Sequence, residues 1–131
     1  MTTVKKLVLA AFFGSFLIGA GLAYAGSVST QQVSISTTNG LDSAKGALRP
    51  VRNSADSTQY IGCSRYAYDT GSNSIVCYAN DANNNYRSCS ASSDAMLRVA
   101  ETLNPAAYLF FAVNTDGSCD RVITTLTSYN L

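Results

Sequence analysis

The clearest strand pattern in the chain lies in residues 59–91, QYIGCSRYAYDTGSNSIVCYANDANNNYRSCSA. Its Tyr- and Ile-rich runs alternate between apolar and polar residues, which is typical of half-buried strands. The polar clusters at residues 69–73 and 81–85 interrupt this alternation, as turns do. The stretch therefore predicts three antiparallel strands in a meander, at residues 59–68, 74–80 and 86–91.

The register of these strands places the cysteines. If the first hairpin turns about Thr70 and the second about Asn83, Cys63 faces Cys77 and Cys77 faces Cys89. Because side chains alternate between the faces of a sheet, this cysteine row shares its face with a small apolar set suited to lie under a helix. That set consists of Ile61, Ala67, Ile75, Ala79 and Ala91.

The period of the pattern changes after this stretch. Residues 92–104 place apolar side chains at helical spacing behind a capping serine, and Asn104-Pro105 ends the helix. Two further strands are expected at residues 108–113 and 120–128, around Asp116-Gly117, which we take as the strongest hairpin signal in the chain. The predicted fold class is α+β: a small antiparallel sheet, with elements in the order β-β-β-α-β-β and one helix packed on one face.

The first 58 residues have a different character. Two lysines, an apolar run at residues 7–22 and the sequence Ala23-Tyr24-Ala25 predict a secretory signal peptide at residues 1–25. The alternative is an uncleaved anchor, although this apolar run is shorter than the ~20 residues that span a bilayer. Residues 26–58 are rich in Ser, Thr and Asn and predict a weak strand or two, or a tether, so we place the folded domain at residues 59–131.

The four cysteines predict two disulfides, because their number is even and the chain carries an export signal. We favour Cys63–Cys77 with Cys89–Cys119, which staples the first hairpin and ties the strand before the helix to the closing hairpin. Four cysteines allow three pairings, and the sequence leaves the other two open. Zinc is disfavoured because no C-x-x-C pair is present, so we expect no metal and no cofactor.

The composition disfavours several classes of function. The chain has no His, which removes the commonest metal ligand and the usual general base, and its net charge of +1 offers no basic footprint for nucleic acid. A calcium loop beginning at Asp81 is disfavoured because Tyr86 stands where glycine is needed. Most of the acids that could form a glycosidase-like pair lie in turn clusters, where Asp bonds the local backbone. These acids are Asp69, Asp81, Asp116 and Asp120.

The sheet face opposite the cysteines is the candidate binding site. It carries tyrosines among serines and asparagines, and this composition is typical of surfaces that recognise protein or glycan. The alternative is that the N-terminal segment or the second hairpin covers this face. The tyrosines are Tyr60, Tyr66, Tyr68, Tyr78 and Tyr86.

We therefore expect an exported protein, periplasmic or secreted, that is not an enzyme and binds a partner through this face. The partner, an unknown protein or a glycan, and the oligomeric state are not determined by the sequence. Nucleic acid is not expected as a partner, and neither is a membrane after signal cleavage. Two alternatives remain open: an inhibitor of an extracytoplasmic hydrolase that presents the loop at residues 69–73, and a small carboxylate-dependent hydrolase.

Overall fold

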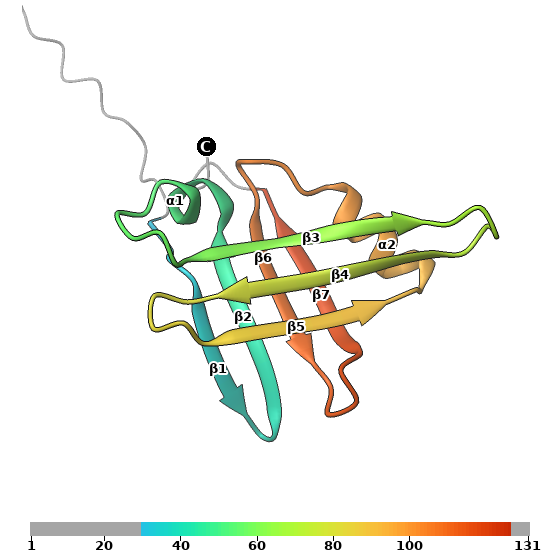
Figure 1. Ribbon diagram of the computed structural model, residues 1–131, viewed down its shortest axis with the longest axis horizontal. Helices are drawn as coiled ribbons and strands as arrows, with labels where there is room; N and C mark the ends of the chain where they lie inside the picture. Colours follow the sequence, from blue (N-terminus) through green and yellow to red (C-terminus); the bar gives the residue numbers. More distant parts are fainter. Residues whose placement is uncertain (1–29, 127–131) are drawn as a thin grey trace, which may run out of the picture.

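The computed structural model describes residues 30–126, which form two antiparallel sheets and two helices (Figure 1). The four-stranded sheet has the order β1-β2-β6-β7, and the three-stranded sheet the order β3-β4-β5. The elements are β1 (Ser34–Thr38), β2 (Leu41–Ala47), α1 (Leu48–Arg52), β3 (Tyr60–Ala67), β4 (Asn73–Asn80), β5 (Tyr86–Ala91), α2 (Asp94–Glu101), β6 (Tyr108–Val113) and β7 (Cys119–Thr125). The expected signal peptide and the last residues of the expected final strand lie outside the described residues.

The α+β class, the antiparallel pairing and the predicted order of elements after residue 58 are confirmed. The strands divide between two sheets, however, whereas we expected one. In Figure 1 the strands of the three-stranded sheet run across those of the four-stranded sheet behind them. The core lies between these two layers, because buried residues of both sheets belong to one apolar cluster.

The N-terminal segment supplies half of the four-stranded sheet. β1 and β2 form a hairpin, and β2 pairs along its other edge with β6. The pairing of β2 with β6 therefore joins the N-terminal segment to the domain that we placed after residue 58. The hairpin turn is Asn39-Gly40, and both residues have positive φ, 52° and 77°, as a two-residue type I′ turn requires. In the β6–β7 hairpin, whose Asp116-Gly117 pair we took as the strongest turn signal, only Gly117 of that pair has positive φ.

Small residues allow β2 to lie in the core. Ala44 and Ala47 are fully buried, and Gly46 between them is buried. A Cβ on Gly46 would lie 3.3 Å from Val51 Cγ2 of α1 and 3.4 Å from Ile61 Cγ2 of β3. Larger residues would separate these elements, so the strand is built from residues that resemble a loop in composition.

Helix α2 is shorter than the predicted span of residues 92–104. Its N-cap is Ser93, whose hydroxyl accepts a hydrogen bond from the Met96 N–H at 3.4 Å. Leu97 and Ala100 are buried, and the helix packs against β7 and β4. No helix in residues 30–126 is long and apolar enough to cross a bilayer.

The cysteine row is covered mainly by the four-stranded sheet. Ile75 and Cys77 are fully buried in the cluster that contains Leu109 and Phe111 of β6. The helix covers only part of this face, because the other sheet occupies the rest. Ala67, which we expected in the same apolar set, is exposed because it lies where β3 runs into the projecting hairpin (Figure 1).

The predicted pairing of the cysteines is confirmed, with disulfides Cys63–Cys77 and Cys89–Cys119. Cys77 has a neighbour on each side, and the phase of the hydrogen-bond ladder distinguishes them. The N–H of Tyr68 donates to Ser72, and that of Asp81 donates to Asn85. Counting along the strands, Cys77 faces Cys63 at a non-hydrogen-bonded site and Cys89 at a hydrogen-bonded site.

Opposed Cα atoms are closer at non-hydrogen-bonded sites of an antiparallel ladder. The Cα atoms of Cys63 and Cys77 are 3.9 Å apart. Cys89 instead reaches the other sheet, where its Cα lies 4.9 Å from that of Cys119. One disulfide therefore braces the three-stranded sheet, and the other joins the two sheets.

Candidate binding surface

The outer face of the three-stranded sheet carries four tyrosines of the predicted site, and the fifth, Tyr68, directly follows β3; together we call them the tyrosine surface (Tyr60, Tyr66, Tyr68, Tyr78 and Tyr86). Even-numbered residues of β3, β4 and β5 point outward because their odd-numbered neighbours, such as Ile75 and Cys77, fill the core. Four of the tyrosines are between 45% and 55% exposed. The fifth, Tyr78 on the central strand, is half-buried.

Contacts with three residues of the neighbouring strand β3 hold Tyr78 in place. It pairs across the strands with Gly62, and its hydroxyl lies 3.9 Å from where a Cβ on that glycine would be. The hydroxyl also lies 3.2 Å from Ser64 Oγ, within hydrogen-bond distance. The ring packs edge-on against Tyr60, with 6.1 Å between the ring centroids. Tyr78 therefore forms a positioned aromatic centre between the more exposed tyrosines.

The tyrosine surface contains no charged strand residue. The outward positions of β3, β4 and β5 hold only Tyr, Gly, Ser, Val and Asn. Such a face offers aromatic area together with hydroxyl groups, whereas the amide of Asn80 is buried.

The strands of the two segments that we considered as covers for this face lie elsewhere. The N-terminal hairpin β1–β2 and the C-terminal hairpin β6–β7 both belong to the four-stranded sheet, which packs on the cysteine side. Within residues 30–126, the exposure of Tyr66 and Tyr86 shows that the tyrosine surface faces solvent.

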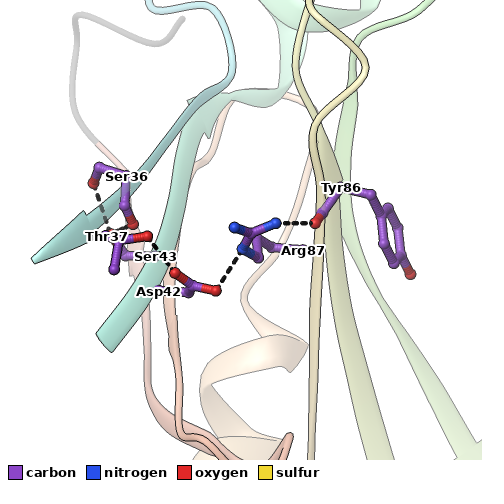
Figure 2. Close-up of polar contacts among 6 residues, drawn as sticks. All are labelled: Ser36, Thr37, Asp42, Ser43, Tyr86 and Arg87. Carbon is purple, nitrogen blue, oxygen red and sulfur yellow. Dashed lines mark hydrogen bonds and ion pairs between the residues drawn. The ribbon is translucent and has the colours of Figure 1, made fainter. Parts of the chain in front are cut away.

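An ionic network flanks the tyrosine surface beside Tyr86 (Figure 2). Arg87 Nε lies 2.6 Å from Asp42 Oδ2, and Arg87 Nη1 donates to the Tyr86 carbonyl at 2.8 Å. The other oxygen of Asp42 accepts a hydrogen bond from the Thr37 hydroxyl. That bond, and to a smaller extent the charge of Arg87, holds the pKa of Asp42 below its usual value. The network fixes the start of β5 against β2, and sequence reasoning missed it because the two strands are distant in the chain.

The carboxylates considered for catalysis are engaged locally. Asp81 accepts hydrogen bonds from the backbone N–H groups of Asn83 and Asn85 and from the Asn85 side chain, each at 2.9 Å. The Asn85 side chain makes the largest contribution to the lowered pKa of Asp81. Asp116 accepts from Ser118 in the same manner, and the Ser118 hydroxyl is the main cause of its lowered pKa. These two acids organise turns, as the sequence pattern indicated.

The other two candidate acids do not join them. Asp120 pairs with its neighbour Arg121 at 2.8 Å, and Asp69 is exposed in the first hairpin turn. Within residues 30–126, no group of three or more Asp, Glu, Cys or His side chains is arranged to hold a metal ion.

A groove that the sequence did not indicate borders the tyrosine surface. It has a volume of about 690 Å³ and lies between α1, the edge of β3 and the loop after α2. Tyr78 and Gly62 line it, so the groove and the tyrosine surface share a boundary, and Arg49 and Arg52 of α1 line it as well. The paired arginines in residues 49–52 were a signal available in the sequence.

Comparison with known proteins does not assign this site. No protein-family model matches the chain, and no match was found among curated proteins or solved structures.

Proposed function

We propose that this protein is an exported, non-enzymatic binding protein whose tyrosine surface is the contact site for a protein or glycan partner. The observation that carries the proposal is the group of four exposed tyrosines, three on one sheet face without charged strand residues and Tyr68 directly after β3. Single exposed apolar residues are ordinary, whereas several large ones gathered on one face mark an interaction site.

The chemistry of the face supports recognition. Tyrosine offers a large contact area with few side-chain torsions to immobilise, together with a hydroxyl that donates and accepts hydrogen bonds. Tyr78 is already held by Gly62, Ser64 and Tyr60, so little of its side-chain entropy remains to be lost on binding. An uncharged face fits a neutral partner surface, because a charged group placed there would lose water without gaining an ion pair.

The scaffold supports the same role. The Cys63–Cys77 disulfide lies directly behind the tyrosine surface, and Cys89–Cys119 fixes this sheet to the other one. Binding sites on rigid strands hold their geometry better than sites on loops.

The experiment is capture of a partner from culture medium and cell envelope by the immobilised protein, with a glycan array in parallel. Tyr66→Ala or Tyr86→Ala should weaken binding of the captured partner by ~2 kcal/mol or more if either tyrosine is a hot spot. Ile123→Ala is the matched control, because Ile123 is equally exposed but lies on the other sheet. Tyr→Phe at the same positions separates the ring from the hydroxyl. If the control weakens binding as much as the tyrosine variants, the face assignment is wrong.

Export has its own test. The two disulfides are compatible with an oxidising compartment. We expect the intact mass of material recovered outside the cytoplasm to correspond to a chain that begins at Gly26. A membrane-bound form that retains residues 1–25 would contradict cleavage.

The β3–β4 hairpin favours a second candidate, inhibition of an extracytoplasmic hydrolase. This hairpin projects beyond the body of the protein (Figure 1), and residues 65–73 are all exposed. The Cys63–Cys77 disulfide closes its base, as suits a loop presented to an active site. Inhibition at one-to-one stoichiometry with a purified protease or lysozyme, lost when Asp69, Thr70 and Asn73 of the loop at residues 69–73 are replaced by glycine or serine, would support this role over the tyrosine surface.

A further inference from the structure

The groove beside β3 combines a free strand edge with two unpaired arginines. β3 is the first strand of its sheet and pairs only with β4. Because Tyr68 and Ser72 form a hydrogen-bonded pair, the even-numbered residues of β3 bond β4 and the odd-numbered residues direct their N–H and C=O groups away from it. Ile61 and Cys63, which line the groove, are two of these residues.

Those edge groups have no partner strand in the described part of the chain. Among residues 30–126, no backbone hydrogen bond from another segment reaches Ile61 or Cys63 on this side. A row of unpaired N–H and C=O groups at a sheet edge is a template for an additional strand. The groove therefore offers backbone hydrogen bonds at the spacing of a polypeptide.

The charged side chains that line the groove are all positive. Arg49 and Arg52 lie three residues apart on α1, are exposed and line the groove, and no acidic residue lines it with them. Neither arginine has a salt bridge within residues 30–126, whereas Arg65, Arg87 and Arg121 each have a carboxylate within 2.8 Å. Two free guanidinium groups favour a carboxylate-bearing occupant.

Part of the groove lining is apolar. Leu103 and Pro105 in the loop after α2 contribute to it, and Tyr78 contributes an aromatic ring. The volume of about 690 Å³ is in the range of about 300–1,000 Å³ that is typical of ligand sites. The groove thus combines hydrogen-bonding, cationic and apolar surface in one concavity.

We propose that this groove binds an extended acidic peptide segment, which pairs with the edge of β3 at Ile61 and Cys63 and places a carboxylate on Arg49 and Arg52. A peptide fits better than an acidic glycan or a free anion, because only a peptide offers donors and acceptors at the repeat of the strand edge. The site is separate from the proposed contact surface, although Tyr78 borders both.

The test uses the purified, disulfide-bonded protein and a capped hexapeptide in which two glutamates alternate with valine and threonine. Isothermal titration compares it with the same peptide carrying glutamine. We expect the glutamate peptide to bind about tenfold more tightly, and Arg49→Gln or Arg52→Gln to remove about tenfold in affinity. Arg98→Gln is the matched control, because Arg98 is an exposed arginine with the same charge that does not line the groove. It should leave the affinity unchanged.

Two N-methylated peptides test the strand pairing. One is methylated at its odd-numbered positions and the other at its even-numbered positions. Because only alternate N–H groups of an added strand face β3, one of these peptides should lose binding and the other should retain it. Equal affinity of the two would overturn the pairing, even if the arginine variants had an effect.

Other outcomes also decide against the proposal. Equal binding of the glutamine peptide, or equal loss with Arg98→Gln, would show that no specific carboxylate site exists. Acetate or an acidic oligosaccharide that competes at lower concentration than the peptide would identify an anion or glycan site. Tyr66→Ala should not change peptide binding, so failure of the tyrosine surface and failure of this groove are distinguishable.

Discussion

Asp42 in β2 and Arg87 in β5 form an ion pair between the two sheets, with 2.6 Å between Asp42 Oδ2 and Arg87 Nε (Figure 2). Both side chains are about one-third exposed. The pair joins the strand that follows the Asn39-Gly40 turn to the strand that carries Tyr86. It joins β5 to β2, whereas the Cys89–Cys119 disulfide, two residues further along β5, joins β5 to β7, so the two sheets are joined by an ion pair and by a covalent bond.

The ion pair should contribute a small, salt-sensitive stabilisation. Partly exposed pairs are screened by solvent, so Asp42→Asn and Arg87→Gln should each destabilise the protein less than loss of either disulfide. A double-mutant cycle in low and high salt measures the coupling, which should shrink as salt rises. Coupling that does not depend on salt would show that hydrogen-bond geometry, rather than charge, joins the sheets.

The disulfide between the sheets should stabilise the fold more than the disulfide within the hairpin. Its sequence separation is 30 residues, against 14 for Cys63–Cys77, and the entropy removed from the unfolded chain grows with loop length. We expect Cys89→Ala with Cys119→Ala to lower the free energy of unfolding by roughly 3 to 4 kcal/mol, and Cys63→Ala with Cys77→Ala to lower it slightly less. Denaturant unfolding of both double variants checks this order. Thiol titration of the denatured, unreduced protein should detect no free cysteine.

Protonation of Asp56 should lower the stability of the folded protein in acid. The Gln59 side chain, followed by the backbone N–H groups of Gln59 and Thr58, lowers the pKa of Asp56 from 3.8 to about 2. The folded state therefore binds a proton less readily than the unfolded state, so this stabilisation is complete above about pH 4 and is lost as the pH falls toward 2.

Asp56→Asn tests this assignment, because it removes the titrating group. Melting temperatures measured from pH 2 to pH 6 should decline less steeply in acid for the variant than for the unmodified protein. Asp81 and Asp116 also have lowered pKa values, so part of the decline should persist. Parallel profiles for the two proteins would show that Asp56 does not contribute.

The two faces of the three-stranded sheet should respond differently to truncation. Ile75 is fully buried between the sheets, so Ile75→Ala should cost about 2 to 5 kcal/mol. Tyr66 is 45% exposed, so Tyr66→Ala should change stability by no more than about 0.5 kcal/mol. The destabilisation caused by Tyr78→Ala should lie between these two values, because the ring of Tyr78 is half-buried. Chemical denaturation of the three variants gives the order, and a large loss for Tyr66→Ala would place that residue in the core.

The local features of this protein were determined by its sequence. Short turns and alternating residues specify which neighbours in the chain pair, so the register of β3, β4 and β5 followed from residues 59–91 alone, and with it the cysteine row and the tyrosine surface. This register places Cys77 opposite both Cys63 and Cys89, and we favoured Cys63–Cys77 because it staples the first hairpin and leaves Cys89 to pair with Cys119.

Tertiary structure decided how distant segments meet. β2 joins β6 across about sixty residues of chain, and its small residues carry no strand pattern because α1 and β3 approach it too closely for larger side chains. The separation into two sheets, the Asp42–Arg87 pair and the groove lined by Arg49 and Arg52 all depend on that packing. Sequence periodicity reports which face of an element is buried, and it does not report which other element covers that face.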